Sequence, residues 1–408
     1  MEKVMEQGNS IFIEEIIEKK QIETHFQPIL SAKKNKVAGL EALSRGYHAA
    51  AGWISPVTLF SQAAAAGLSL ELDRLCRAKA LEAFAGLHSE ELLFLNIDTG
   101  VIAADTVGSK HLLEAVQEAG IKPQQVVIEI VEAKASDVAA LKQFIHNYKE
   151  YGFTIAIDDI GNGYSNLDRI LQIKPDILKI DRGLCRDIGN DYYKQEIFTS
   201  LVSLSRRIGA LVVAEGVETK EEVMMSFELG ADLLQGYYFA KPQKLNGAVT
   251  YANGSIFAEF KKSKIDKIRQ GVKRQRICES VMTCMLQVLE GCAAENFSKR
   301  LQALAEQYNH MEYLYIVDAA GVQVTDSICS SRHPACKNHS LFQVAGKGAD
   351  QSLKDYYLHM MAGKDCYISE PYMSLATGNV CITSSAAFTD REGRRFIVCA
   401  DFEPRSDF

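Results

Sequence analysis

The chain has 408 residues, is 47% hydrophobic and 24% charged, and carries a formal net charge of −7. The length suits two or three domains, and the composition is typical of a globular protein. The acidic net charge argues against a protein whose main task is to bind nucleic-acid phosphates. No segment approaches the roughly 18 apolar residues of a membrane span, and glutamates interrupt the first apolar run, unlike a signal peptide. We therefore expect a cytoplasmic protein with no membrane span and no nucleic-acid polymer as its partner.

Up to Gln243, short apolar segments alternate with segments of helical spacing. The apolar segments predict strands at 24–30, 37–43, 92–98, 126–132, 154–158, 176–181, 210–215 and 232–239. Most of the intervening segments predict helices, at 69–84, 111–119, 138–151, 192–208 and 220–229. Thr219 is placed as a helix N-cap, and Gly230 as a helix stop.

Eight strands with intervening helices predict an α/β fold, a (β/α)₈ barrel of the TIM type. The first two strands follow each other without a helix, so we expect a hairpin and an antiparallel first strand. A doubly wound open sheet is the alternative, but it usually carries a glycine-rich phosphate loop after its first strand. The sequence has no such loop there.

The pattern changes after Pro242. Residues 256 to about 308 predict a long connector helix, with Gly271 and Gly291 as possible breaks. The segment Lys261–Arg276 carries eight Lys or Arg against one Asp, which we interpret as a solvated helix face rather than a nucleic-acid or membrane patch.

A small α+β domain follows from Met311. Strands are predicted at 313–318, 321–326, 366–369, 380–388 and 395–401, with a helix at 355–361. The expected domains are therefore a barrel over 1–248, a helical connector over 249–308 and a C-terminal domain over 309–408.

Polar residues occur on nearly every predicted barrel strand. They are Glu41, Asn96, Glu129, Asp158, Asp159, Lys179, Glu215 and Gln235. The carboxyl ends of barrel strands meet at one face, so five carboxylates, two amides and a lysine are expected to lie together. Polar groups at such places are costly to bury unless they are paired or bind metal.

A cluster of like charges requires cations to stay ionised. Oxygen ligands without His or Cys favour Mg²⁺ or Mn²⁺ over Zn²⁺, and there are enough ligands for two ions. Two such ions suit phosphodiester cleavage by an activated water. We expect no organic cofactor.

These residues stand in an ordered set of motifs. The set comprises Gln27-Pro28-Ile29, Glu41-Ala42-Leu43-Ser44-Arg45, Asn96-Ile97-Asp98, Glu129-Ile130-Val131-Glu132, residues 158–165 (DDIGNGYS), Lys179-Ile180-Asp181, residues 214–219 (AEGVET) and Gln235-Gly236-Tyr237. Over residues 20–243 the chain resembles the EAL-domain cyclic di-GMP phosphodiesterases, which open the cyclic dinucleotide to linear pGpG.

The resemblance implies a role for each matching position. Glu41, Asn96, Glu129 and Asp158 would hold the first metal, and Asp159 would bridge to the second or hold it. Lys179 would position the attacking water, and Glu215 would bind a metal-linked water and act as general base.

The remaining positions would bind substrate or support a loop. Gln27 and Arg45 would hold the dinucleotide, since arginine can clamp a phosphate with two hydrogen bonds. Gln235 would orient a ligand or water, while Glu132 and Glu218 would support the loop after the fifth strand.

Two alternatives stay open. The family usually has Phe at 160, Thr or Ser at 162 and Ser at 166, where this chain has Ile160, Asn162 and Asn166. A catalytically weak or inactive cyclic di-GMP receptor is therefore an alternative to the enzyme. An enolase-type lyase with carboxylate-bound Mg²⁺ is a third hypothesis, although the adjacent Asp158 and Asp159 favour two metals.

The C-terminal segment also has a resemblance. Residues 367–372 (YISEPY), 374–378 (SLATG) and 355–357 (DYY) are similar to PAS-like sensory domains of the PDC type. This similarity implies regulation of the barrel, an unidentified small-molecule ligand, or a dimerisation role without a ligand. A homodimer is expected from the family and from the long helix.

Eight of the ten cysteines lie from Cys278 onward, and a reducing compartment would keep them as thiols. One group, Cys329, His333, Cys336 and His339, has ligand types that suit zinc or another soft metal. Its spacing matches no standard zinc finger, so a cysteine-bearing loop is the simpler interpretation.

Overall fold

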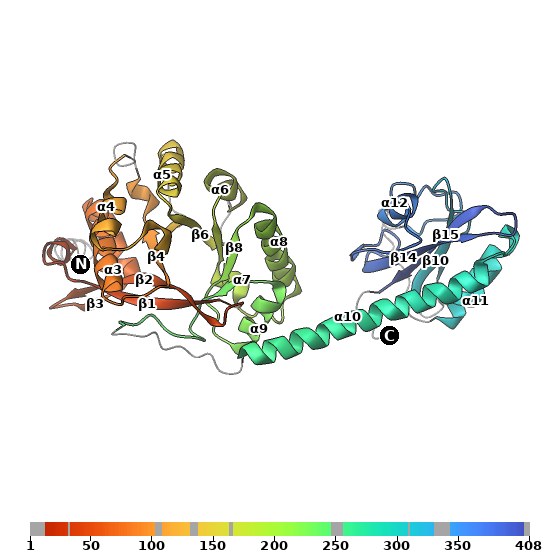
Figure 1. Cartoon of the computed structure of the whole chain (residues 1–408), viewed down its shortest axis with the longest axis horizontal. Helices are drawn as coiled ribbons and strands as arrows, with labels where there is room; N and C mark the ends of the chain where they lie inside the picture. Colours follow the sequence, from red (N-terminus) through yellow and green to blue (C-terminus); the bar gives the residue numbers. More distant parts are fainter. Residues whose placement is uncertain are drawn as a thin grey trace, which may run out of the picture. The chain divides into compact units, whose positions relative to one another are not determined.

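The structure is a computed structural model that describes residues 13–31, 33–102, 108–130, 138–162, 166–245, 256–308, 311–329 and 343–403. The chain divides into two compact units, Met1–Lys264 and Ile265–Phe408. Each unit is built on its own sheet (Figure 1). Among the described helices, none has the length and apolar composition needed to cross a membrane.

In the described part of the first unit, eight strands close a barrel. They are β1 (Ile22–Ser31), β2 (Lys36–His48), β4 (Leu92–Ile97), β5 (Val126–Ile130), β6 (Thr154–Ile160), β7 (Ile177–Ile180), β8 (Leu211–Ala214) and β9 (Leu233–Leu234). The order β1-β9-β8-β7-β6-β5-β4-β2 returns to β1, and β1 is antiparallel to both of its neighbours. The predicted barrel and its antiparallel first strand are thus confirmed. A short strand, β3 (Gly52–Ile54), pairs antiparallel with the carboxyl end of β2.

Helices surround this barrel (Figure 1). They are α2 (Pro56–Ala66), α3 (Ser69–Ala85), α4 (His111–Glu118), α5 (Val138–Glu150), α6 (Asn166–Ile173), α7 (Arg182–Cys185), α8 (Tyr192–Ile208) and α9 (Lys220–Leu229). The side chain of Thr219 caps α9 in a capping box with Glu222, and Gly230 ends the helix at a φ of 104°. Both positions behave as the sequence predicted.

The barrel core has two parts because successive strand residues point to opposite faces. Leu40, Ile128 and Leu178 point outward and pack in the layer between strands and helices. A second cluster fills the inside of the barrel: Ile29, Phe94, Val127, Ala156, Ile177, Val213 and Leu233. We call this inner cluster the floor of the barrel, because the polar residues lie directly above it.

One long helix, α10 (Ile256–Leu289), begins in the first unit and continues into the second. It runs through Gly271 without a break. It ends before Gly291, which has a φ of 68°, and α11 (Phe297–Gln307) follows. The sequence therefore identified one of its two possible break points correctly.

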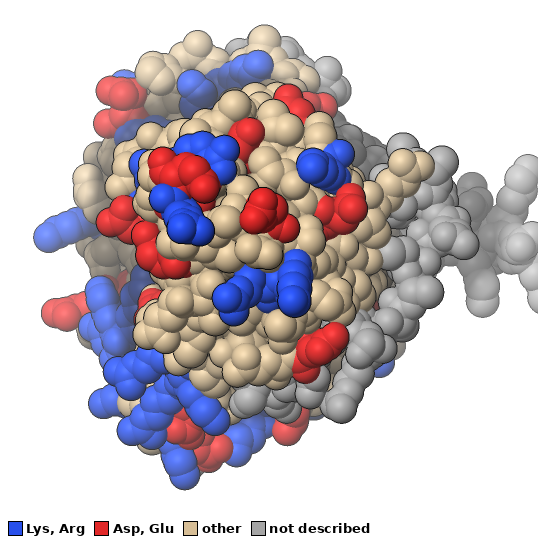
Figure 2. All heavy atoms as spheres, turned by 90° about the vertical axis from the view of Figure 1, so that its right-hand side faces the viewer, with Lys and Arg blue, Asp and Glu red and all other residues tan. Residues whose placement is uncertain are grey.

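The second unit carries an antiparallel sheet in the order β11-β10-β15-β14-β12, with β13 beside β14. Its elements are β10 (Met311–Asp318), β11 (Ile328–Cys329), α12 (Asp355–Met361), β12 (Cys366–Ile368), β13 (Tyr372–Met373), β14 (Val380–Thr389) and β15 (Arg395–Phe402). One face of this sheet packs on α10 and α11. Charged side chains of both signs lie on the face of the molecule that Figure 2 shows.

The predicted strand 321–326 forms only isolated bridges, at Val322 and Gln323. Asp318 Oδ1 accepts hydrogen bonds from the backbone N–H groups of Ala320 and Val322 and so holds a turn. The Thr325 hydroxyl accepts a hydrogen bond from the Ile316 N–H. Side chains thus take up backbone groups that a strand ladder would otherwise use.

Candidate functional site

The polar residues of the barrel form one layer directly above the apolar floor. On parallel strands each lies two residues after a floor residue, so it points to the same inner face. The pairs are Phe94 and Asn96, Val127 and Glu129, Ala156 and Asp158, Ile177 and Lys179, Val213 and Glu215, and Leu233 and Gln235. On the antiparallel β1 the order reverses, so Gln27 precedes Ile29. The layer therefore follows from strand alternation alone.

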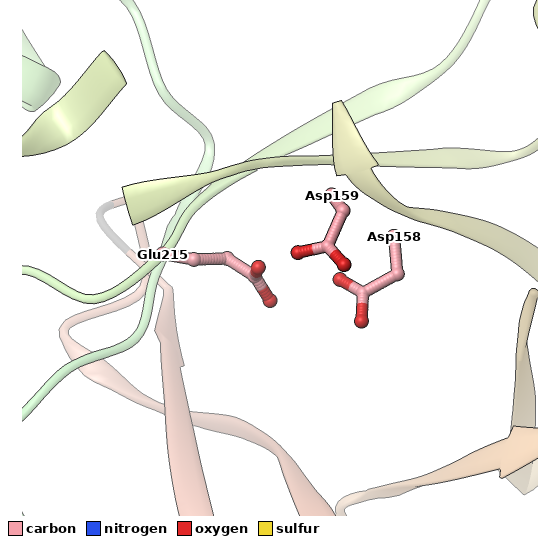
Figure 3. A group of neighbouring side chains, drawn as sticks. All are labelled: Asp158, Asp159 and Glu215. Atoms are coloured by element: carbon pink, nitrogen blue, oxygen red, sulfur yellow. The ribbon is translucent and has the colours of Figure 1, made fainter. Parts of the chain in front are cut away.

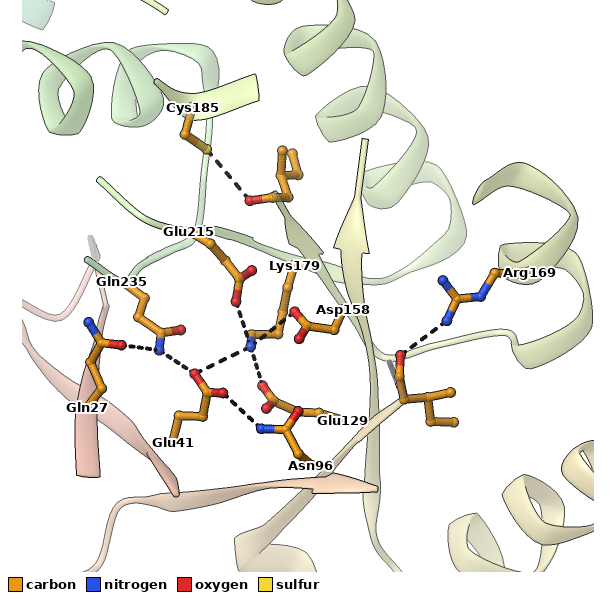
Figure 4. Close-up of polar contacts among 12 residues, drawn as sticks. Gln27, Glu41, Asn96, Glu129, Asp158, Arg169, Lys179, Cys185, Glu215 and Gln235 are labelled. Carbon is orange, nitrogen blue, oxygen red and sulfur yellow. Dashed lines mark hydrogen bonds and ion pairs between the residues drawn. The ribbon is translucent and has the colours of Figure 1, made fainter. Parts of the chain in front are cut away.

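Lys179 lies at the centre of this layer (Figure 4). Its side chain is 1% exposed, and its Nζ lies 2.6 Å from Glu129 Oε1 and 2.6 Å from Glu215 Oε1. The Oδ1 atom of Asp158 lies at 3.2 Å and Glu41 Oε2 at 3.6 Å. One ammonium group thus holds four carboxylates in place.

Burial opposes charge on this cluster. It raises the pKa of Glu129 well above the ordinary range, and the neighbouring charge of Glu41 adds to the effect. Burial likewise raises the pKa of Glu215. For Lys179, burial favours the neutral amine, but the surrounding carboxylates outweigh burial and raise the pKa. The four acids exceed the charge that one lysine can balance.

Amide side chains complete the layer (Figure 4). Asn96 Nδ2 donates to Glu41 Oε1 at 2.9 Å. Gln235 Nε2 donates to Glu41 Oε2 and to Gln27 Oε1, the latter at 3.2 Å. Gln27 in turn donates to the Ala240 carbonyl oxygen at 3.1 Å. This chain of hydrogen bonds orients Glu41 toward the barrel axis.

Asp158, Asp159 and Glu215 form a second acidic group (Figure 3), with a carboxylate oxygen of each within 4.8 Å of the others. Adjacent residues of a regular strand point to opposite faces of the sheet. On a regular strand, the carboxylates of Asp158 and Asp159 could therefore not both reach the acidic group. The pairing of β6 with β7 shifts register between Ile157 and Ile160, and Asp159 has a φ of 58°. This irregularity brings both carboxylates to the site at a cost in backbone strain.

The donor set fits divalent metal ions. Glu129 Oε2 is buried and has no hydrogen-bond partner among the described residues, so it is free to bind a cation. The group in Figure 3 offers carboxylate oxygens alone, which hard cations such as Mg²⁺ and Mn²⁺ prefer. The structure thus brings together the residues that the sequence predicts as metal ligands, and metal binding by them stays a prediction.

Other predicted residues lie apart from this network. The half-buried Arg45 donates to the Ser44 carbonyl oxygen at 2.9 Å. Glu218 pairs with Arg182 at 2.9 Å, where Arg182 also packs against Gly216. Cys329 is exposed at the end of β11. Glu132, His333, Cys336 and His339 lie outside the described residues.

Sequence reasoning missed a neighbouring cavity of about 380 Å³ at the carboxyl ends of β2 and β4. Asn96 lines it together with Phe60 of α2 and Arg77 of α3. Arg77 pairs with the buried Asp73 one helical turn away. An Asp and an Arg four residues apart on a helix are a detectable signal, but it does not show which strand ends the helix faces.

The chain is similar to known proteins in both sequence and structure. The EAL domain model matches residues 12–242. The uncharacterized EAL-domain containing protein YkuI of Bacillus subtilis is 26% identical over 384 residues, which cover 90% of this chain and 91% of YkuI. The crystal structure of YkuI with cyclic di-GMP and calcium has the same fold: the TM-score is 0.79 at 24% identity, over 97% of this chain and 99% of that chain.

Two further relatives match the barrel. The cyclic di-GMP phosphodiesterase NbdA of Pseudomonas aeruginosa is 30% identical over 230 residues, which are 55% of this chain and 29% of NbdA. Klebsiella pneumoniae BlrP1 at pH 9.0, solved with manganese and cyclic di-GMP, is 33% identical with a TM-score of 0.50, over 55% of this chain and 56% of that chain. The chain thus spans less than two thirds of either relative.

Proposed function

Because the chain belongs to the EAL domain family, we propose that it is a metal-dependent phosphodiesterase that hydrolyses cyclic di-GMP to linear pGpG. The observation that carries this proposal is the layer of four carboxylates and Asn96 around Lys179 at the carboxyl end of the barrel, with Asp159 beside Asp158 and Glu215. Relatives of 30% and 33% identity are a cyclic di-GMP phosphodiesterase and a protein solved with manganese and cyclic di-GMP.

We propose two divalent ions, Mg²⁺ or Mn²⁺, and no organic cofactor. Glu41, Asn96, Glu129 and Asp158 would hold one ion, and Asp159 would hold the other or bridge the two. Bound ions of this kind lower the pKa of water and offset charge on a phosphodiester.

The protein's own groups would perform the remaining tasks. Glu215 would accept the proton of the attacking water, and Lys179 would hold that water and offset the charge that develops on the phosphoryl oxygens. Arg45 and Gln27 would hold the dinucleotide, and Gln235 would orient a ligand or water. Glu132 and Glu218 would support the loop after β6.

The cavity beside Asn96 would receive part of the dinucleotide. It offers the aromatic ring of Phe60 and the guanidinium of Arg77, groups on which a planar base can stack. Its volume of about 380 Å³ suits one nucleoside rather than the whole substrate.

The organisation of the whole chain is part of the same proposal. A catalytic barrel over 1–248, a connector over 249–308 and a PAS-like sensory domain over 309–408 would form a regulated homodimer. None of the described cysteines forms a disulfide. We place the protein in the cytoplasm. Metal binding by Cys329, His333, Cys336 and His339 stays a prediction.

The test is turnover of cyclic di-GMP by the purified full chain in Mn²⁺ and in Mg²⁺, with pGpG measured by chromatography. We expect wild type to form pGpG and Glu41→Gln to lose at least about 10²-fold in rate, since it weakens metal binding. The matched control is Glu221→Gln, an exposed glutamate of α9, which should keep the wild-type rate.

Three results would contradict the proposal in different ways. Tight binding of cyclic di-GMP without product would identify a receptor, the alternative that Ile160 and Asn162 keep open. Failure to bind any cyclic dinucleotide would favour another barrel enzyme such as an enolase-type lyase. Full activity of Glu41→Gln would place the chemistry elsewhere in the molecule.

A further inference from the structure

The C-terminal unit has a cavity of about 220 Å³ that the barrel chemistry does not use. It lies on the face of the sheet opposite to α10 and α11, where β10 and β15 pack against α12. Four tyrosines line it, Tyr313, Tyr315, Tyr356 and Tyr372, together with Asp401. A water molecule occupies about 30 Å³ in the liquid, so the cavity suits a small organic molecule.

Asp401 is the buried carboxylate of this cavity. It lies on β15 between Tyr313 of β10 and Thr383 of β14, and it is 5% exposed. The Thr383 hydroxyl donates to its Oδ1 at 2.6 Å. Among the described residues, no cationic side chain forms an ion pair with it, although Lys354 lines the same cavity.

The charges around Asp401 do not favour an anion. Glu312 is also buried on β10, and its charge adds to the effect of burial, which raises the pKa of Asp401 to about 7. The charge of Lys354 lowers that pKa, but it is the smallest of the contributions. A neutral apolar ligand would leave the buried carboxylate with the Thr383 hydroxyl but without a balancing positive charge, which is costly.

The tyrosine rings of the cavity offer a second attraction for a cation, besides the carboxylate of Asp401. Aromatic rings attract an ammonium group through the negative face of the ring. Two of the tyrosine hydroxyls are engaged within the protein, Tyr356 with Gln351 Oε1 at 3.0 Å and Tyr372 with Thr383 Oγ1 at 2.5 Å. Hydrogen bonds thus hold these rings in place beside Asp401.

We propose that this cavity is a binding site for a small organic ammonium ion, with the charged group at Asp401 and the hydrocarbon part against the tyrosine rings. The proposal does not depend on the activity of the barrel. It assigns a chemical class to the ligand of the C-terminal unit.

The test is direct binding to the full chain by titration calorimetry, with ethanolamine and choline as probes. The matched neutral compound is 3,3-dimethyl-1-butanol, which has the shape of choline without its charge. We expect saturable binding of at least one ammonium probe, at least about tenfold tighter than the neutral compound. The proposal would be overturned if neither ammonium probe binds, or if neither binds more tightly than 3,3-dimethyl-1-butanol.

Variants locate the binding in this cavity. Asp401→Asn should lose the tenfold preference for charge, whereas Lys354→Met should keep or increase it because a like charge is removed. Loss of binding in Lys354→Met would contradict the proposal. If Asp401→Asn does not fold, Ala376→Phe fills the same cavity from its lining and should abolish binding. Unchanged binding in that variant would also overturn the proposal.

Discussion

In the barrel, four carboxylates surround the ammonium group of Lys179, whereas in the C-terminal unit Asp401 is buried beside tyrosines and a threonine hydroxyl. A lysine within the site holds several acids in fixed positions and offsets part of their charge. A hydroxyl offers one hydrogen bond and no charge. The first arrangement is suited to metal ions, and the second leaves a carboxyl group that either keeps its proton or takes a cation from outside.

We expect the largest effect from removing the ammonium group of Lys179 in the barrel. Lys179→Met would leave four carboxylates, of which Glu41 and Glu129 are buried, without their cation, so we expect loss of pGpG formation. We also expect a decrease of about 3–5 kcal/mol in the free energy of unfolding, measured in metal-free buffer by hydrogen exchange of β7.

The matched control for this variant is Lys149→Met. Lys149 lies 3.0 Å from Asp176, and both side chains are partly exposed. Its loss should change the free energy of unfolding by less than about 1 kcal/mol. Similar effects of the two variants would mean that Lys179 has no special part in holding the acids.

The second prediction concerns the pH dependence of the C-terminal unit. The pKa of Asp401 is raised to about 7 in the folded state from 3.8. As pH rises from about 4 to 7, the unfolded chain therefore loses this proton while the folded chain keeps it, and the unit loses up to ~4 kcal/mol of stability. Above pH 7 the loss levels off.

Asp401→Asn should remove this dependence of the free energy of unfolding on pH. Between pH 5 and pH 8, the stability of the variant should therefore increase relative to that of wild type. The measurement is hydrogen exchange of β14 and β15, corrected for the intrinsic pH dependence of exchange. Asp365→Asn, at an exposed position of the same unit, is the control and should behave as wild type. A wild-type slope in Asp401→Asn would show that another group titrates.

We expect the smallest effect from removing the Thr383 hydroxyl, which donates a hydrogen bond to Asp401. Thr383→Val keeps the shape of this fully buried side chain but removes its hydrogen bonds with Asp401 and Tyr372. We expect a loss of about 1–2 kcal/mol above pH 7, where the carboxyl group is charged, and a smaller loss at pH 5. The same exchange measurement checks it, with the half-buried Thr389→Val of the same strand as control. An equal loss at both pH values would contradict a role in supporting the charge.

Much of the barrel and its site could be predicted from the sequence. Alternating apolar segments and helical spacing indicated the eight strands, and the spacing of the motifs placed Glu41, Glu129 and Lys179 on them. These signals are local, because the side-chain period of a strand and the caps of a helix depend on neighbours in the chain. The predicted strand 321–326 failed because Asp318 and Thr325 satisfy backbone groups through their side chains.

The sequence by itself determined the eight-stranded barrel and the set of polar residues at its strand ends, since both follow from periodicity along the chain. Only the tertiary structure decided that Lys179 lies between Glu129 and Glu215, that a shift in register brings Asp158 and Asp159 to one place, and that Asp401 faces a cavity. These three features depend on distances between strands and helices far apart in the chain. Burial and charge act through space, so the chemistry of these groups is set by neighbours that sequence order does not reveal.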